Sequence, residues 1–316
     1  MFVFLRKVGI ITKVIIIAAL LFVVKTTIVE ARDVRIIVLK SYEAQPYNEA
    51  LAGFEQYLRE QKIKPHYKIY PLEGDVTKVE QTIQEIKKGK VDLIVTIGSL
   101  ATDTMIKKII DIPIVACLVL SSENLKNAFN ATGVSLEFPL EIQFETLRRF
   151  LPKAKTIGVI YNPEENEKKI KEAATVARKM GLRLEGQKVS APQDVPAALE
   201  NLSRRADVIW GVPDDLVLSP QLAKHILLFS FRNNIPFVGL SSAWVKAGAL
   251  YSLDWDYSDI GSQCGEIAIE IIKGVSPRNI PPASPRMVMY SLNLKTAQHM
   301  KIIISEDFIH KAKYTF

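Results

Sequence analysis

Cysteine and histidine are scarce in this sequence of 316 residues, which contains two cysteines and four histidines. The histidines do not show the spacing of metal ligands, and nothing else indicates a cofactor, so we predict neither a metal site nor a cofactor. Cys117 and Cys264 lie far apart in the sequence, although an oxidising compartment would permit a disulfide between them. Because Cys117 falls in the apolar stretch IPIVACLVL, we expect it to be buried and favour two inert thiols.

Signatures of nucleotide binding and of hydrolysis are also missing. Gly98 follows an apolar stretch, but it is not part of a GxGxxG pattern, and no GKS or GKT follows it. Ser99 lacks a GxSxG frame, and no histidine stands at the end of a predicted strand to activate it. Asp215 and Glu165 can be imagined as a catalytic carboxylate pair, but nothing in their spacing requires it. The sequence therefore disfavours an enzyme.

Long apolar runs and basic clusters are absent too. The formal net charge of +7 is spread without a basic cluster interleaved with aromatic residues, so we expect no nucleic-acid partner. The apolar run Val14–Val24 has eleven residues, whereas a membrane-spanning helix needs roughly 20. Basic residues precede this run, and Val29 and Ala31 follow it with the spacing of a cleavage site. We predict a signal peptide over residues 1–31 and a mature chain that begins at Arg32; an uncleaved anchor is the alternative.

The sequence does contain a regular alternation of strand and helix patterns. In its first part, predicted strands alternate with helices near residues 47–58, 76–86 and 105–110, and the strands cover residues 34–40, 67–70, 91–97 and 114–120. After a break predicted at 130–137 and a helix over 138–150, a second set of strands covers residues 156–161, 182–189, 207–212, 236–240 and 249–253. This order is typical of parallel sheets covered by helices. We therefore predict an α/β fold with two doubly wound parallel-sheet lobes.

The last part of the chain predicts a hinge. A helix at 260–272 and a strand from Met287 come after the second sheet is complete. In the simplest arrangement, the helix at 260–272 returns to the first lobe, and the chain then crosses back to the second lobe. We predict that lobe 1 comprises residues 32–136 and about 258–285, and lobe 2 residues 137–257 and about 286–316. About three crossings would join the lobes, and such a connection can absorb a rotation between rigid bodies.

Ligands of open parallel sheets bind beyond the carboxyl ends of the strands. In the first lobe, the residues at these ends are Ser41, Tyr42, Gly98, Ser99, Ser121 and Ser122. In the second lobe, they are Tyr161, Asn162, Ser190, Asp214, Asp215, Ser241, Ser242 and, after the short strand, Asp254.

Several of these side chains have both a binding and a structural interpretation. The Ser99 hydroxyl, beside free N–H groups of a helix start, suits a carboxylate, or it only caps its helix. Asp214 and Asp215 suit an ammonium group, and one of them equally suits a helix cap. Tyr42 and Trp244 can stack on an organic solute or only pack, and Asp254 can bind solute or fix the hinge.

Five stretches in this order give the chain a family resemblance. They are IGSLATD (97–103), ATGVSLEFPLE (131–141), LPKAKTIGVIYNPEEN (151–166), VKAGALYSLDWDYSDIG (245–261) and the tail SLNLKTAQHM (291–300). With these stretches the chain resembles the periplasmic substrate-binding proteins of ABC transporters, in particular the tryptophan/tyrosine-type group with the type I periplasmic binding protein fold. The resemblance extends over essentially all of the predicted mature chain.

The resemblance implies site residues as well as a function. Ser99, Ala101 and Thr102 match the family's lobe-one ligand loop, Asp215 matches an acid after a lobe-two strand, and Tyr161, Asn162 and Glu165 match an asparagine-proline turn. The family's Asp-Pro pair after the strand that ends at Leu120 is missing, and Asn166-Glu167-Lys168 replaces its asparagine-serine. These departures leave the identity of the solute open.

We therefore expect a periplasmic, monomeric protein that closes on one small, amino-acid-like, zwitterionic or anionic solute. It would then deliver the solute to a membrane permease. The alternative is a sensory protein that signals to a membrane receptor such as a sensor kinase, which the sequence does not separate from transport. A DNA-binding repressor of similar fold would need a helix-turn-helix where this chain has its predicted signal segment.

Overall fold

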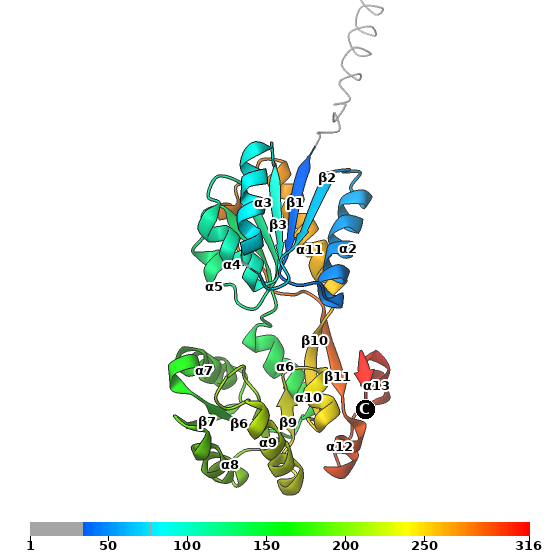
Figure 1. The fold of residues 1–316 in the computed structure, drawn as a ribbon. Coiled ribbons are helices and arrows are strands. Elements are labelled where there is room, and N and C mark those ends of the chain that lie inside the picture. The colour runs from blue at the N-terminus through cyan, green and yellow to red at the C-terminus, as the bar shows by residue number, and fades with distance from the viewer. Residues whose placement is uncertain (1–33, 76) are drawn as a thin grey trace, which may run out of the picture.

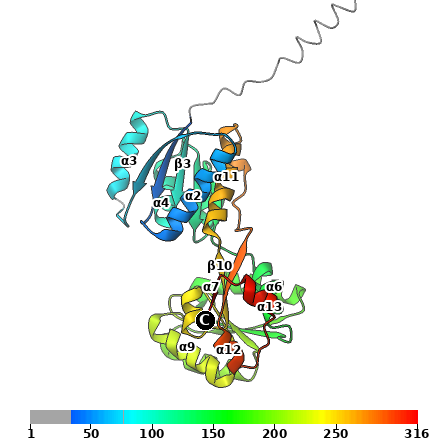
Figure 2. The same ribbon diagram turned by 90° about the vertical axis from the view of Figure 1, so that its right-hand side faces the viewer.

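The computed structural model describes residues 34–316 apart from Val76, so the predicted signal peptide lies outside the described residues. The described chain forms two α/β lobes, one above the other, joined by a narrow connection (Figures 1 and 2). Within it, no helix combines the length and the apolar character needed to span a bilayer.

Lobe 1 is built on a five-stranded parallel sheet with the order β2-β1-β3-β4-β5. Its strands are β1 (Arg35–Lys40), β2 (His66–Pro71), β3 (Leu93–Ile97), β4 (Ile114–Val119) and β5 (Ala131–Ser135). Its helices are α2 (Gln45–Glu60), α3 (Thr77–Lys88), α4 (Ser99–Lys108), α5 (Glu123–Lys126) and α11 (Tyr257–Ile272). Every residue of β3 and β4 is buried, as expected for central strands with helices on both faces.

The break predicted at 130–137 is wrong, because β5 lies there. Its sequence ATGVS has a weak strand pattern, but its backbone lies close to β4. A Cβ atom on Gly133 would stand 1.9 Å from the carbonyl oxygen of Ala116. The helix predicted to include Ile109 and Ile110 ends at Lys108 instead, and Ile109 is extended because the chain turns there toward β4.

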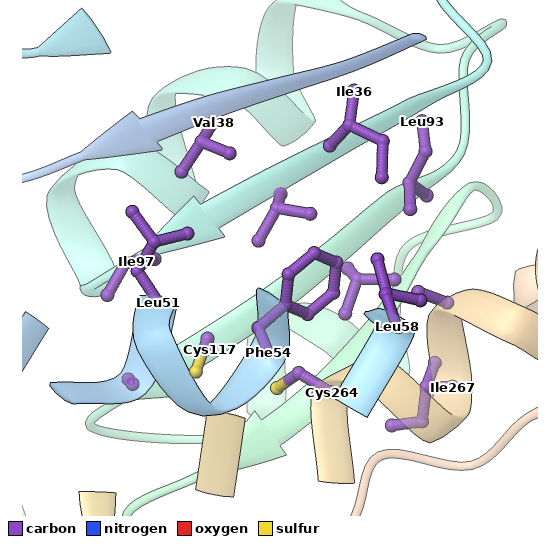
Figure 3. Packing of buried hydrophobic residues seen from close by; sticks show 14 of the residues in the cluster. Ile36, Val38, Leu51, Phe54, Leu58, Leu93, Ile97, Cys117, Cys264 and Ile267 are labelled. Carbon is purple, nitrogen blue, oxygen red and sulfur yellow. The ribbon is translucent and has the colours of Figure 1, made fainter. Parts of the chain in front are cut away.

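Helix α11 returns from the far end of the sequence and packs against α2 in lobe 1 (Figure 1). Glycine permits the close approach, since a Cβ on Gly261 would meet the carbonyl oxygen of Ala50 at 1.9 Å. Beneath these helices lies a core that includes Phe54, Cys117 and Cys264 (Figure 3). Both thiols are free and buried, which confirms the predicted burial of Cys117.

Lobe 2 is built on a seven-stranded sheet with the order β12-β11-β10-β9-β8-β6-β7. Its strands are β6 (Thr156–Tyr161), β7 (Arg183–Lys188), β8 (Val208–Trp210), β9 (Phe237–Gly239), β10 (Tyr251–Trp255), β11 (Val288–Leu292) and β12 (Tyr314–Thr315). Strand β11 is antiparallel to β10, whereas the other strand pairs of the sheet are parallel. Its helices are α6 (Leu140–Phe150), α7 (Pro163–Lys179), α8 (Val195–Ser203), α9 (Pro220–Asn233), α10 (Ser242–Ala247), α12 (Leu294–His299) and α13 (Glu306–Lys311), with a 3-10 turn at Pro192–Asp194.

The chain passes between the two sheets three times, after β5, after β10 and before β11. Two of these crossings are braced against each other. The indole N–H of Trp255 donates a 2.9 Å hydrogen bond to the carbonyl oxygen of Leu136. Phe138 stacks on Trp255, with ring centroids 5.7 Å apart and planes at 9°. The connection between the lobes therefore carries an aromatic stack.

Candidate functional site

A cleft of about 890 Å³ lies between the lobes. One wall comes from lobe 1, at Leu120 and Ser122, where β4 ends. The opposite wall comes from lobe 2, at α7 and at the ends of β8 and β9. The floor is formed by the crossings, including Phe138 and Trp255. The cleft thus lies beyond the carboxyl ends of the parallel strands, where open α/β sheets bind ligands.

Aromatic side chains line the deep part of this cleft. Trp210 ends β8, and its indole N–H donates to Oε1 of Gln143 at 3.1 Å. Tyr251 begins β10, and burial raises the pKa of its hydroxyl. Both side chains are almost wholly buried, and Phe138 and the half-buried Trp255 of the floor add apolar surface to the lining. Such a lining with a few polar groups is typical of sites for small organic molecules.

Charged groups stand at the sides of the cleft. The ammonium of Lys168 lies 3.4 Å from Oε1 of Glu123, and this ion pair connects the two lobes. Its neighbour Lys169 is partly buried; burial lowers the pKa of its ammonium group, and the Glu137 carboxylate partly offsets this effect. The Glu137 carboxylate accepts hydrogen bonds from the N–H and the hydroxyl of Ser122 at 3.2 and 3.3 Å.

The ligand loop predicted in lobe 1 is held together by its own hydrogen bonds. The Ser41 hydroxyl accepts the N–H of Ala101 at 3.0 Å. Thr102 is buried and bonds to the carbonyl oxygen of Gly98 at 2.9 Å. The Ser99 hydroxyl accepts the N–H of Leu120 at 2.9 Å, so it contacts a residue of the cleft wall.

Two other predicted residues of lobe 1 lie at the surface. Tyr42 is half exposed and stacks against Tyr47, with ring centroids 6.5 Å apart. The Ser121 hydroxyl accepts the N–H of Glu123 at 3.3 Å.

In lobe 2 the two neighbouring aspartates have different environments. Asp214 is buried, and its carboxylate accepts three hydrogen bonds, from the backbone N–H of Asn162 at 2.7 Å, the side chain of Asn166 at 3.0 Å and the N–H of Val217 at 3.0 Å. The Asp214 carboxylate therefore stabilises the local fold of lobe 2. Asp215 is exposed, and its N–H donates to Glu165 at 3.1 Å.

The other predicted residues of lobe 2 are engaged in local contacts. Asn162 caps α7 by accepting the N–H of Glu164, the Tyr161 hydroxyl bonds to Glu167, and the Ser190 N–H donates to Asp194. Ser241 precedes α10 and Ser242 is its first residue. Trp244 packs on Phe237, and Asp254 pairs with Lys313.

Only Ser122 and Glu165 of the predicted residues line the cleft as it stands. The other assignments stay predictions. Sequence reasoning missed Phe138, Trp210, Tyr251, Trp255 and Lys169, which do line it. The aromatic residues of the stretches DVIWGV and SLDWDY were a usable signal, because they stand where strands end. Residues 34–316 apart from Val76 contain no group of three or more histidine, cysteine, aspartate or glutamate side chains suited to a metal ion.

Comparisons with known proteins agree with this architecture. The chain is 29% identical over 248 residues to a protein of Clostridioides difficile named tyrosine-binding protein, covering 74% of this chain and 67% of that protein. A ligand-free, open structure of a substrate-binding protein with adhesive properties from Clostridium difficile superposes with a TM-score of 0.74 at 23% identity, covering 89% of this chain and 98% of that one. A domain from Streptococcus pneumoniae in complex with L-Trp gives a TM-score of 0.59 at 23% identity, covering 90% of this chain and 100% of that one.

These likenesses confirm the predicted fold class, two α/β lobes with largely parallel sheets. Residues 34–315 match the family described as ABC transporter substrate binding protein. This match covers nearly the whole described chain and confirms the resemblance found in the sequence. The chain belongs to the ABC transporter substrate binding protein family.

Proposed function

We propose that the protein captures a small, amino-acid-like organic solute in the cleft and delivers it to a membrane permease without transforming it. The observation that carries this proposal is a cleft of about 890 Å³ whose walls come from both lobes and whose floor is the hinge. The family match gives the transport context. The tyrosine-binding relative and the tryptophan complex support a solute with an amino-acid skeleton.

Capture works by closure of the lobes. A solute that contacts both walls gains more interaction free energy when the lobes approach, and this difference shifts the population toward the closed state. The arrangement described here corresponds to an open state, in agreement with the higher TM-score against the ligand-free, open neighbour. The permease would recognise the closed outer surface.

We place the protein in the periplasm, as a monomer whose partners are a small molecule and a permease. The signal-peptide pattern of the sequence supports this location, and the even spread of charge argues against a nucleic-acid partner.

A thermal-shift screen of amino acids and related organic acids tests the proposal. At a hundredfold excess over its dissociation constant, the right solute stabilises the folded protein by about 2.7 kcal/mol. Mass spectrometry should recover that solute unchanged after prolonged incubation. A broad screen in which no solute raises the melting temperature would contradict capture, and a transformed solute would contradict the absence of catalysis.

A further inference from the structure

The lobe-two wall of the cleft carries two consecutive lysines with different surroundings. Lys168 has a side chain that is 79% exposed, and it pairs with Glu123 of lobe 1 at 3.4 Å. Lys169 is partly buried and lines the cleft. Within the described part of the chain, no hydrogen bond or ion pair reaches the Lys169 ammonium group. The same turn of α7 thus carries one lysine that forms an ion pair and one that does not.

Two of the acids near Lys169, Glu137 and Glu165, accept hydrogen bonds from other groups, and Glu172, which also lines the cleft, is exposed. The charge of Glu137 raises the pKa of Lys169, but the Glu137 carboxylate accepts hydrogen bonds from the N–H and the hydroxyl of Ser122, at 3.2 and 3.3 Å. Glu165 accepts hydrogen bonds from the side chain of Asn162 at 3.3 Å and from the N–H of Asp215 at 3.1 Å. Among the described residues, Lys169 is therefore a partly desolvated cation with no carboxylate at ion-pair distance.

A partly buried cation of this kind favours an anion. Removing an ammonium group from water is costly unless a hydrogen-bonded opposite charge replaces the lost hydration. The pKa of Lys169 agrees with this picture, because burial lowers it and Glu137 offsets only part of the effect. One ammonium group suits a single negative charge, and the apolar part of the cleft lining, such as the half-buried Trp255, suits an apolar body.

We propose that Lys169 is a specificity-determining residue that binds a carboxylate of the captured solute. The solute class is then a carboxylic acid, amino acids included, with an apolar or aromatic body that packs on the apolar part of the cleft lining. This proposal rests on the proposed capture function and adds the group by which the solute is recognised. The competing position for the carboxylate is the start of α4 at Ser99, whose hydroxyl already accepts the N–H of Leu120 at 2.9 Å.

The test uses matched lysine variants and matched solutes. Calorimetry compares wild type, Lys169→Met and Lys171→Met with L-tyrosine, L-tryptophan, aliphatic amino acids and succinate, each beside its carboxamide. We expect Lys169→Met to bind the acid recognised by wild type with an affinity that is lower by at least about tenfold, the usual effect of losing a charge-assisted hydrogen bond. Lys171→Met should change the affinity for this acid by no more than about twofold, because Lys171 lies outside the cleft lining and its ion pair with Glu167 is 75% exposed on the lysine side. The carboxamide should bind wild type and Lys169→Met equally.

Three results overturn the assignment of Lys169. The first is that wild type and Lys169→Met bind the acid with equal affinity. The second is that Lys169→Met loses affinity for the acid and for the carboxamide to the same extent. The third is that Ser99→Ala lowers the affinity for the acid whereas Lys169→Met does not. This result would assign the carboxylate to the start of α4. The melting temperature of each variant without solute checks that it is folded. If no probe binds wild type, the capture function itself fails, which is a different outcome.

Discussion

The ammonium group of Lys313 lies 3.2 Å from Oδ1 of Asp254 and donates a 2.8 Å hydrogen bond to the carbonyl oxygen of Trp255. It also stands 4.9 Å from the centre of the Tyr257 ring. Lys313 precedes β12, the last strand, whereas the other residues mark the crossing from β10 to α11. The C-terminal segment therefore fastens one of the three connections between the lobes.

Removing this contact should destabilise the protein. The Lys313 and Asp254 side chains are 23% and 8% exposed, so Lys313→Met leaves a buried carboxylate without its partner. We expect the free energy of unfolding to fall by about 1–3 kcal/mol in urea denaturation. Lys311→Met is the matched control, because Lys311 and Asp307 are both 67% exposed, and a change of about 0.5 kcal/mol or less is expected. Equal effects of the two variants would contradict the hinge contact.

Asp214 and Asp215 should differ in their effect on stability. Asp214→Ala removes the acceptor of three N–H groups, and we expect a loss of about 2–3 kcal/mol in the free energy of unfolding. Asp215→Ala changes an exposed side chain, and a change within about 0.5 kcal/mol is expected. Urea unfolding followed by circular dichroism measures both. A neutral Asp214→Ala would show that its carboxylate does not hold the turn before α7.

The approach of α11 to α2 should not tolerate a larger residue at Gly261. A Cβ there would stand 1.9 Å from the carbonyl oxygen of Ala50, so Gly261→Ala must push the helices apart. We expect a loss of about 1–3 kcal/mol, typical of overpacking. Gly89→Ala is the control, since its Cβ would lie 3.5 Å from Glu85, an ordinary contact. Similar melting temperatures for both variants would refute this close packing.

The two thiols should be inert until the protein unfolds. Cys117 and Cys264 are buried in the lobe 1 core, and burial raises the pKa of Cys264, which suppresses its thiolate. We expect no reaction with a water-soluble disulfide reagent in the native state and reaction of both thiols in denaturant. Fast labelling of the native protein, or unreactive cysteines after unfolding, would contradict two free buried thiols.

The sequence predicted the central strands well and the irregular ones poorly. Strands β3 and β4 are continuous apolar runs, so their burial on both faces is visible in the sequence. Strand β5 was missed because it depends on distant partners, namely the backbone of Ala116 and the chain at Ala283. No local pattern records such contacts.

The binding role of the predicted site residues stays a prediction, and the structure shows which contacts these residues make within the fold. The ends of the parallel strands do face the cleft, but most of the hydroxyl and carboxylate groups chosen there serve the fold, as Ser41 and Asp214 do. Lys169 and Trp210 line the cleft because of how the two lobes face each other. That arrangement depends on the three crossings, and spacing within one segment does not reveal it.

Closure on a solute is the central claim, and a distance between the lobes measures it directly. Spin labels on cysteines introduced at Asn127 of lobe 1 and Lys171 of lobe 2, both exposed, report this distance by pulsed electron resonance, while the native thiols stay buried. A solute that raises the melting temperature should shorten the distance and narrow its distribution, and the exposed control Lys311→Met should retain the change. An unchanged distance at saturation with that solute would contradict capture by closure.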